Sequence, residues 1–299
     1  MSAPGASRVN NFADRVLRNR ADRADEPAAY SIWQGRIIEQ LTWGTLASDV
    51  ADCRNSMLRL GVSPGDRIIA QMATGTAALT AFFAAASIGA VWSTVPVGDN
   101  LSEVLRDPGR TPPKVVFCVD GFRRSGTPVH HDVAEIVALC ALSGARVVLV
   151  GDLDPDANVS GAIDWGRLFV QPGVFDIAAV TADHGLCQQL SPSGARWDSP
   201  LVTHGAAATA ALHALAGAAE VRHDSVVTGP AAVGSAEWLR LLGVLSLGVT
   251  IVLSGPDDPT NLDRADRLIA AVTDLPFAQI RTLTAACGRA NTDIGTMLT

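Results

Sequence analysis

The sequence predicts an α/β protein with two stacked lobes, each a mostly parallel sheet flanked by helices. Two observations predict this fold class. Strand-like and helix-like segments alternate along the chain, which favours parallel sheets covered by helices. This alternation runs through two successive cycles, and the chain of 299 residues is long enough to bury a sizeable core.

The first cycle follows a short N-terminal helix. Phe12, Val16 and Leu17 share one face of a helix predicted over 11–19, and a charged stretch then runs to Pro27. A helix over 45–60 is expected to end at Gly61. The other predicted elements of this cycle are a strand at 67–72, a helix at 77–88, strands at 91–95 and 115–119, a helix at 132–142 and a strand at 146–150.

The second cycle comprises a helix near 205–219, a strand at 225–227, a helix at 236–247, a strand at 250–253 and a helix around 263–272. Between the cycles, 151–185 is rich in Asp, Gly and Pro, which is typical of a connection. We therefore predict an N-terminal helix and arm over 1–30, a first lobe over 31–180 and a second lobe over 181–299, packed as one compact unit.

Composition narrows the classes of partner. A net charge of -7, with Lys114 as the one lysine, argues against a nucleic-acid binder, because phosphate affinity rests on clustered Lys and Arg. The longest apolar run, 77–92, is too short for a bilayer and contains Thr80 and Ser87, so we expect a buried helix and no membrane contact.

The cellular compartment is predicted from the cysteines and the N-terminus. The five cysteines are widely spaced among apolar neighbours, as expected of buried thiols in a reducing compartment. They are Cys53, Cys118, Cys140, Cys187 and Cys287. The N-terminus lacks an apolar signal core, so we expect a cytoplasmic protein.

Several strings, in a consistent order, carry a resemblance to a known family. They are NNFADRVLRN at 10–19, LTWGTLASDVADCRNSMLRLGVSPGDRIIAQM at 41–72, ALTAFFAAASIGAVWSTVPVG at 78–98, PKVVFCVDGFRRSG at 113–126 and LRLLGVLSLGVTIVLSGPDDP at 239–259. In order and spacing they resemble the adenylate-forming acyl-CoA synthetases, and within them the acetoacetyl-CoA synthetases. The resemblance implies the fold of that family's N-terminal domain.

The resemblance also locates a degenerate phosphate loop. The family's loop reads Ser-Gly-Thr-Thr-Gly-x-Pro-Lys and is followed by an apolar strand and His-Gly. Aligning on His204 and Gly205 places Ser193 and Gly194 on the Ser-Gly pair. Ala195 and Arg196 then stand in place of the threonines, Trp197 in place of the second glycine, and Pro200 in place of the lysine.

Each of these replacements weakens a phosphate cradle. Such a loop turns successive backbone N–H groups onto the anion and needs glycine at points of close approach, where we expect the Trp197 indole to block it. Pro200 provides neither the lysine charge nor a backbone donor. Arg196 is the residue that could restore charge, and the alternative is a plain connection between two strands.

The matched region also stops before later family motifs. The adenine-binding segment, the Tyr-Gly-x-Thr-Glu motif, the ribose-binding aspartate and the C-terminal domain with its lysine have no counterpart in the sequence after Cys287. We therefore expect a truncated N-terminal domain without a metal ligand for a triphosphate.

One feature that the sequence shares with this family, a pair of arginines, is suited to binding a ligand. Arg123 and Arg124 fall where related short-chain synthetases have arginines near the CoA nucleotide, and an arginine pair can bind a phosphate bidentately. The alternative is a solvated basic turn.

Other groupings of polar residues are better explained as structure. Asp152, Asp154 and Asp156 resemble the start of a calcium loop, but Ala157 and Ile163 stand where glycine and glutamate are needed, so an acidic turn is expected. The run His130-His131-Asp132 lacks a third metal ligand, and Asp132 is expected to be an N-cap. Ser193, Asp198 and His204 have the residue types of a hydrolase triad, without the Gly-x-Ser-x-Gly elbow.

Three hypotheses for function follow. The first is a non-catalytic acyl-CoA synthetase homologue that needs no cofactor and acts by self-association, through a protein partner on the truncated face, or by weak binding of CoA or nucleotide. The second is an ATP-, Mg- and CoA-dependent carboxylate–CoA ligase completed by another chain. The third is a remnant without a biochemical role.

Overall fold

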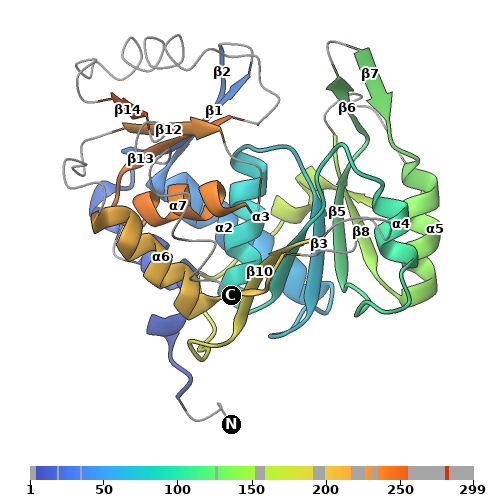
Figure 1. Ribbon diagram of the computed structural model, residues 1–299, viewed down its shortest axis with the longest axis horizontal. Coiled ribbons are helices and arrows are strands. Elements are labelled where there is room, and N and C mark those ends of the chain that lie inside the picture. The colour runs from blue at the N-terminus through green and yellow to red at the C-terminus, as the bar shows by residue number, and fades with distance from the viewer. Residues whose placement is uncertain are drawn as a thin grey trace.

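The computed structural model describes residues 5–18, 20–33, 36–124, 127–151, 159–190, 199–216, 226–230, 233, 235–254 and 280–282. Helices and strands alternate over most of this length, and the strands form two larger sheets and one separate hairpin (Figure 1). The α/β fold class predicted from the sequence is confirmed.

The first large sheet has seven strands in the order β11-β10-β4-β3-β5-β8-β9. Its strands are β3 (Arg67–Gln71), β4 (Val91–Thr94), β5 (Val115–Val119), β8 (Arg146–Val150), β9 (Ala162–Asp164), β10 (Gly185–Gln189) and β11 (Val202–Thr203). All neighbours in it are parallel except β10 and β11. The sheet is mostly parallel, as predicted.

The second large sheet joins the two ends of the chain. It has five strands in the order β14-β12-β13-β1-β2. These are β1 (Pro27–Trp33), β2 (Arg36–Thr42), β12 (Val226–Pro230), β13 (Thr250–Ser254) and β14 (Ile280–Thr282). Ala29 on β1 pairs with Ile251 on β13 in parallel. Both large sheets contain strands from before and from after residue 180. The domain boundary predicted at residue 180 stays a prediction.

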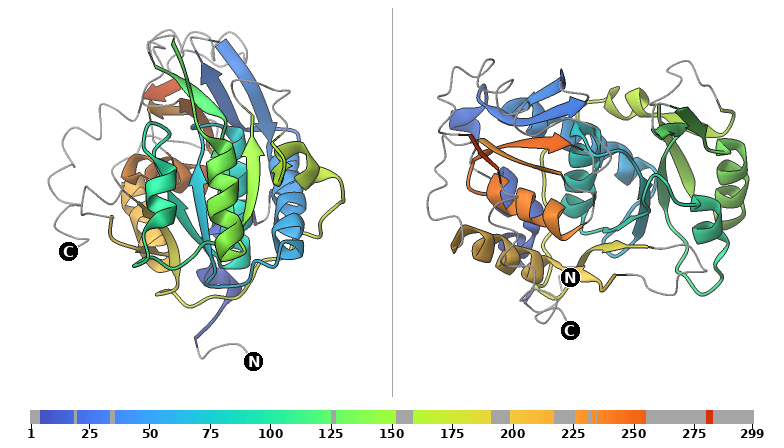
Figure 2. Two further views of the ribbon diagram at one scale, coloured as in Figure 1. Left: turned by 90° about the vertical axis from the view of Figure 1, so that its right-hand side faces the viewer. Right: turned by 45° about the horizontal axis from the view of Figure 1, so that its top comes forward.

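Helices cover both faces of the seven-stranded sheet. The helices are α1 (Phe12–Leu17), α2 (Trp43–Arg59), α3 (Thr76–Ile88), α4 (Leu101–Arg106), α5 (Val133–Ser143), α6 (His204–Ala216) and α7 (Ala236–Leu245). Figures 1 and 2 show α4 and α5 at one end of the molecule, and α6 and α7 beside the five-stranded sheet at the other. Neighbouring residues of β3 pack on opposite faces of this sheet. Ile68 packs into the core that contains α2 and α3, and Ile69 packs into the core that contains α4 and α5.

One aromatic cluster links the two large sheets. Phe82 on α3 meets Trp92 on β4 at 5.9 Å between ring centroids and Trp238 on α7 at 6.3 Å, both edge to face. Trp92 in turn meets Phe117 on β5 at 6.0 Å. These buried rings place α7 and the seven-stranded sheet around a common core, because large aromatic side chains contribute most of the buried apolar area in such contacts.

A two-stranded hairpin stands apart from both sheets. It consists of β6 (Gly121–Arg124) and β7 (Thr127–His130), which pair only with each other among the described strands. Figure 1 shows it projecting beyond the end of β5.

The polar details predicted for the helices are largely confirmed. Asp132 is the N-cap of α5, where its side chain accepts the Glu135 N–H at 2.9 Å. Gly61 follows α2 with a φ of 84°, a left-handed conformation that glycine adopts without strain. Four of the predicted thiols, Cys53, Cys118, Cys140 and Cys187, are free and buried, while Cys287 and the helix predicted at 263–272 lie outside the described residues.

Among the helices in the described part of the chain, none combines the length and the apolar character that a bilayer span requires. The apolar run at 77–92 forms most of α3 and the start of β4. The helix predicted at 77–88 agrees with α3, which ends before Gly89 (φ 82°).

Candidate functional site

The candidate site lies at the carboxyl edge of the seven-stranded sheet. Because β10, β4, β3 and β5 are parallel, their carboxyl ends meet at one edge. Ligands of open α/β sheets bind outside the carboxyl ends of the strands. Both groups of residues singled out in the sequence leave the sheet at this edge: the segment with Ser193 follows β10, and the hairpin with Arg123 follows β5.

The predicted phosphate-loop residues Ser193, Gly194 and Arg196 lie outside the described residues. The base of their connection is described. The Ser199 N–H donates to the Gln189 carbonyl at 2.9 Å, and the Gln189 N–H donates to Ser199 Oγ at 2.7 Å. Pro200, which stands in place of the family's lysine, is exposed and precedes β11 by two residues. An antiparallel strand pair therefore closes the base of the connection.

The arginine pair is placed through its backbone. Arg123 and Arg124 lie on β6 opposite Pro128 and Thr127. Strands β4 and β3 separate β10 from β5, so the two candidate groups start three strand spacings apart, about 14 Å at roughly 4.8 Å each. The fold brings them to one edge without making them neighbours.

Sequence reasoning missed the polar residues that line this edge between the two groups. Gln71 at the end of β3 is fully buried, and its Nε2 donates to the carbonyls of Pro96 at 3.0 Å and Asp99 at 2.9 Å. Burial raises the pKa of the Asp99 carboxyl above its usual value. A glutamine inside the apolar run RIIAQM was the signal available in the sequence.

His131 closes the base of the hairpin. Its backbone N–H donates to the Asp120 carbonyl at 2.9 Å, and its ring lies 5.6 Å from that of Phe122. Burial lowers the pKa of His131, although a hydrogen bond to the Val97 backbone and the charge of Asp120 act in the opposite direction. The half-buried His131 therefore links the base of the hairpin to the end of β5 through its backbone and contacts the hairpin through its ring.

His204, the residue used to align the phosphate loop, is fully buried at the start of α6. Its Nδ1 accepts the Phe12 N–H at 2.9 Å, so Nε2 carries the proton of the neutral ring. Burial, together with the charge of nearby His184, lowers the pKa of His204 to about 3. This imidazole supports the fold, and its suggested triad partners Ser193 and Asp198 lie outside the described residues.

Metal-ligating side chains do not gather at the candidate site in the described structure. Among the described residues, no group of three or more His, Cys, Asp or Glu side chains is placed to hold an ion. The acidic run with Asp152, Asp154 and Asp156 lies outside those residues.

A comparison with protein families matches residues 17–151 to the AMP-binding enzymes. This region includes β3, β4, β5, β8 and the hairpin of the candidate site. The match covers less than half of the 299 residues of the chain.

Relatives of this AMP-binding region agree with the sequence resemblance. The acetoacetyl-CoA synthetase of Danio rerio is 31% identical over 122 residues, which are 40% of this chain and 18% of the relative. The acetoacetyl-coenzyme A synthetase of Rhizobium meliloti is 26% identical over 156 residues, which are 52% of this chain and 23% of the relative. The chain thus matches less than a quarter of the length of these relatives.

The structural likeness extends past the AMP-binding region. The acetoacetyl-CoA synthetase of Streptomyces lividans superposes with a TM-score of 0.74 at 25% identity, over 94% of this chain and 44% of that one. The α/β architecture is therefore that of the N-terminal domain of the acyl-CoA synthetases.

Proposed function

We propose that this chain is a non-adenylating homologue of the acyl-CoA synthetases that acts by binding. The chain binds another protein or a second copy of itself, or it binds CoA or a nucleotide weakly. The observation that carries the proposal is the replacement of the family's loop lysine by Pro200, at the base of the connection between β10 and β11.

A proline at this position removes two contacts with a triphosphate at once. Lysine supplies a point charge to phosphate oxygens, and proline supplies none. Proline also lacks the backbone N–H that a phosphate cradle uses. With Ala195 and Trp197 in the same connection, the residues present do not fit a bound ATP and its Mg²⁺.

A CoA nucleotide is the ligand that the retained residues suit best. Arg123 and Arg124 follow β5 at the carboxyl edge, and a guanidinium group matches the geometry of a phosphate. Calorimetry with CoA should give weak binding that the double substitution Arg123→Ala and Arg124→Ala removes. Equal binding by the double variant would contradict a role of these arginines.

The decisive experiment is ATP–pyrophosphate exchange with acetoacetate, measured with the purified chain and again with added cell extract. The proposal predicts exchange at background level in both cases, because no charged cradle holds the triphosphate. The matched variants are Arg196→Ala and Arg15→Ala, the second an exposed arginine on α1.

The opposite result has a definite meaning. Exchange that disappears in Arg196→Ala and persists in Arg15→Ala would establish the alternative, a carboxylate–CoA ligase completed by another chain. The names of the matched relatives make acetoacetate the substrate to try first.

A further inference from the structure

A pocket lies away from the candidate site at the carboxyl edge of the sheet. It opens between α1, the start of α2 and the segment around Asp176, with a volume of about 560 Å³. Small-molecule sites typically measure about 300–1,000 Å³. None of its lining residues belongs to β10, the connection after it, or the β6–β7 hairpin.

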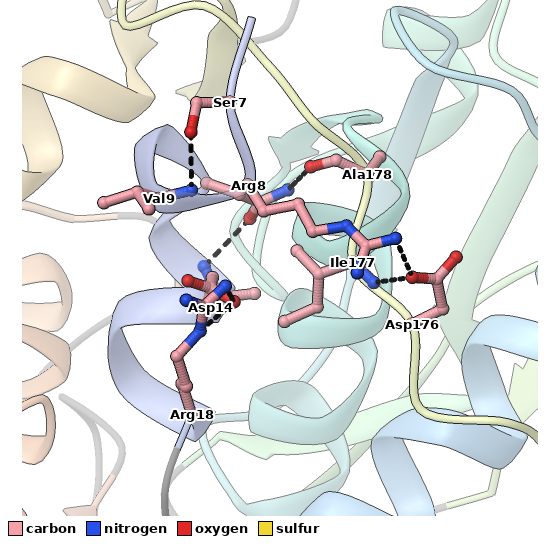
Figure 3. A network of polar contacts seen from close by, with 10 residues as sticks. Ser7, Arg8, Val9, Asp14, Arg18, Asp176, Ile177 and Ala178 are labelled. Atoms are coloured by element: carbon pink, nitrogen blue, oxygen red, sulfur yellow. Dashed lines mark hydrogen bonds and ion pairs between the residues drawn. The ribbon is translucent and has the colours of Figure 1, made fainter.

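The walls of this pocket combine apolar surface with paired charges. Leu17, Ala47 and Phe175 are among the apolar lining residues. Figure 3 shows the Ile177 side chain between two ion pairs, Arg8 with Asp176 and Arg18 with Asp14.

Both carboxylates of the pocket are already neutralised. Arg18 contacts Asp14 through Nε at 2.8 Å and a terminal nitrogen at 2.7 Å. Asp176 lies 3.0 Å from Arg8 and 3.6 Å from Arg54, which is outside the lining. Arg20 adds a third guanidinium to the wall, so cations exceed anions there.

Two buried donors on this wall have no acceptor among the described residues. They are Nε1 of Trp43, a side chain with 1% of its surface exposed, and Nε of Arg20. The Arg20 guanidinium lies 5.2 Å from the centre of the Trp43 ring, so the two donors belong to one stacked pair. Buried donors are nearly always satisfied in folded proteins, by protein, water or ligand.

The buried groups of this pocket that lack a hydrogen-bond partner are donors on side chains. The first backbone N–H groups of α2 are already bonded, Trp43 N to the Glu26 carbonyl at 2.9 Å and Gly44 N to the Ala24 carbonyl at 2.8 Å. No buried side-chain acceptor among the described lining residues is left without a partner. The unpartnered buried side-chain atoms of the pocket are therefore donors, and its lining has more cationic than anionic side chains.

We propose that this pocket binds a small organic anion, with its oxyanion group toward Trp43 and Arg20 and its apolar body against Leu17, Ala47 and Phe175. The anion supplies the acceptor that the stacked pair lacks. Both donors are enclosed in the free protein, and Arg20 also donates to the Ser246 carbonyl at 2.6 Å, so binding requires the Arg20 side chain to move.

Calorimetry with 4-phenylbutyrate tests this proposal. The expected dissociation constant is about 1 mM or lower, a modest affinity for a ligand of this size. Two analogues separate the requirements: 4-phenylbutanol lacks the charge, and butyrate lacks the ring. Each should bind at least about tenfold more weakly, since a charge-assisted hydrogen bond and the apolar contact are lost in turn.

The substitution Trp43→Phe isolates the unmatched donor. It keeps the ring under Arg20 and removes Nε1, so affinity for 4-phenylbutyrate should fall about fivefold to tenfold. The midpoint of urea unfolding should fall to a similar extent in Trp43→Phe and Trp238→Phe, because each loses one ring of a buried indole. Trp238→Phe is the matched control, since Trp238 is also buried with an unpartnered Nε1 but lies outside the pocket lining.

The substitution Ala47→Phe fills the pocket from α2 and should abolish binding, while Ser48→Phe on the exposed side of the same helix should not. Absence of 4-phenylbutyrate binding to the wild-type chain at about 10 mM would overturn the proposal. So would affinities in Trp43→Phe and Ala47→Phe equal to those of their controls.

Discussion

His204 shows how a residue with catalytic chemistry can serve the fold alone. It follows the strand after the candidate phosphate loop, where sequence patterns draw attention to it. Its ring is fully buried, and Nδ1 is occupied by the Phe12 N–H. With Nδ1 occupied and a pKa of about 3, this imidazole is a weak base, poorly suited to general base catalysis near neutral pH.

The lowered pKa of His204 predicts a pH dependence of stability. The unfolded chain binds a proton at a pKa near 6.5, and the folded chain only near 3. Stability is therefore fully present above pH 6.5 and falls as the pH drops toward 3. Between pH 7 and pH 5 this residue should cost about 2 kcal/mol.

Urea unfolding at both pH values measures this cost. His204→Asn keeps an acceptor for the Phe12 N–H and cannot titrate, so its loss between pH 7 and pH 5 should be smaller by about 2 kcal/mol. His130→Asn, on the exposed end of the hairpin, is the control. Equal losses in His204→Asn and the wild type would show that His204 is not kept neutral by burial.

Helix α1 is short, and one buried side chain ties it to the rest of the molecule. Asn11 Nδ2 donates to the carbonyls of Ala86 at 2.8 Å and Ala178 at 3.2 Å. Its Oδ1 accepts the Ala13 N–H at 3.0 Å and caps the helix. A six-residue helix gains little from propensity alone, so these contacts with α3 and the segment near Ala178 fix its position.

Replacing this side chain should destabilise the protein. Asn11→Ala removes the N-cap and the side-chain donor to the Ala86 and Ala178 carbonyls, at a cost of about 2–3 kcal/mol. Asn10→Ala is the matched control, because Asn10 bonds more exposed carbonyls of Gly5 and Val180, and its loss should be below about 1 kcal/mol. Equal urea midpoints for the two variants would contradict the role given to Asn11.

The elements predicted well from the sequence are those buried on both faces. Strands β3, β5 and β8 are apolar throughout or nearly so, and their ends fall within a residue of prediction. β2 was missed because most of its residues are exposed and the strand carries no alternating pattern. The hairpin and the six-residue α4 were missed because neither buries enough apolar residues to produce a period.

At the scale of the whole molecule, the pairing of strands that are distant in the chain could not be predicted from the sequence. Ala29 pairs with Ile251, and nothing local to either strand specifies that partner. The family resemblance was more informative than periodicity, and the structural likeness over 94% of the chain confirms it. The site itself was predicted only as residue types, because the distance between β10 and β5 depends on strand order.

We propose that the fold of the acyl-CoA synthetases is retained in this chain without their chemistry. The sheet, its covering helices and the carboxyl edge are those of the acyl-CoA synthetases, and they depend on buried apolar residues such as Phe82 and Trp92. Phosphate binding depends instead on a few residues of one connection, including Pro200, which can change without loss of the core.

Crystals soaked in ATP and Mg²⁺ test the central claim most directly, because electron density reports where a triphosphate lies. The account predicts no ordered triphosphate density beside the connection from β10 to β11. Ordered phosphates along Gly194, with Arg196 in contact, would contradict it.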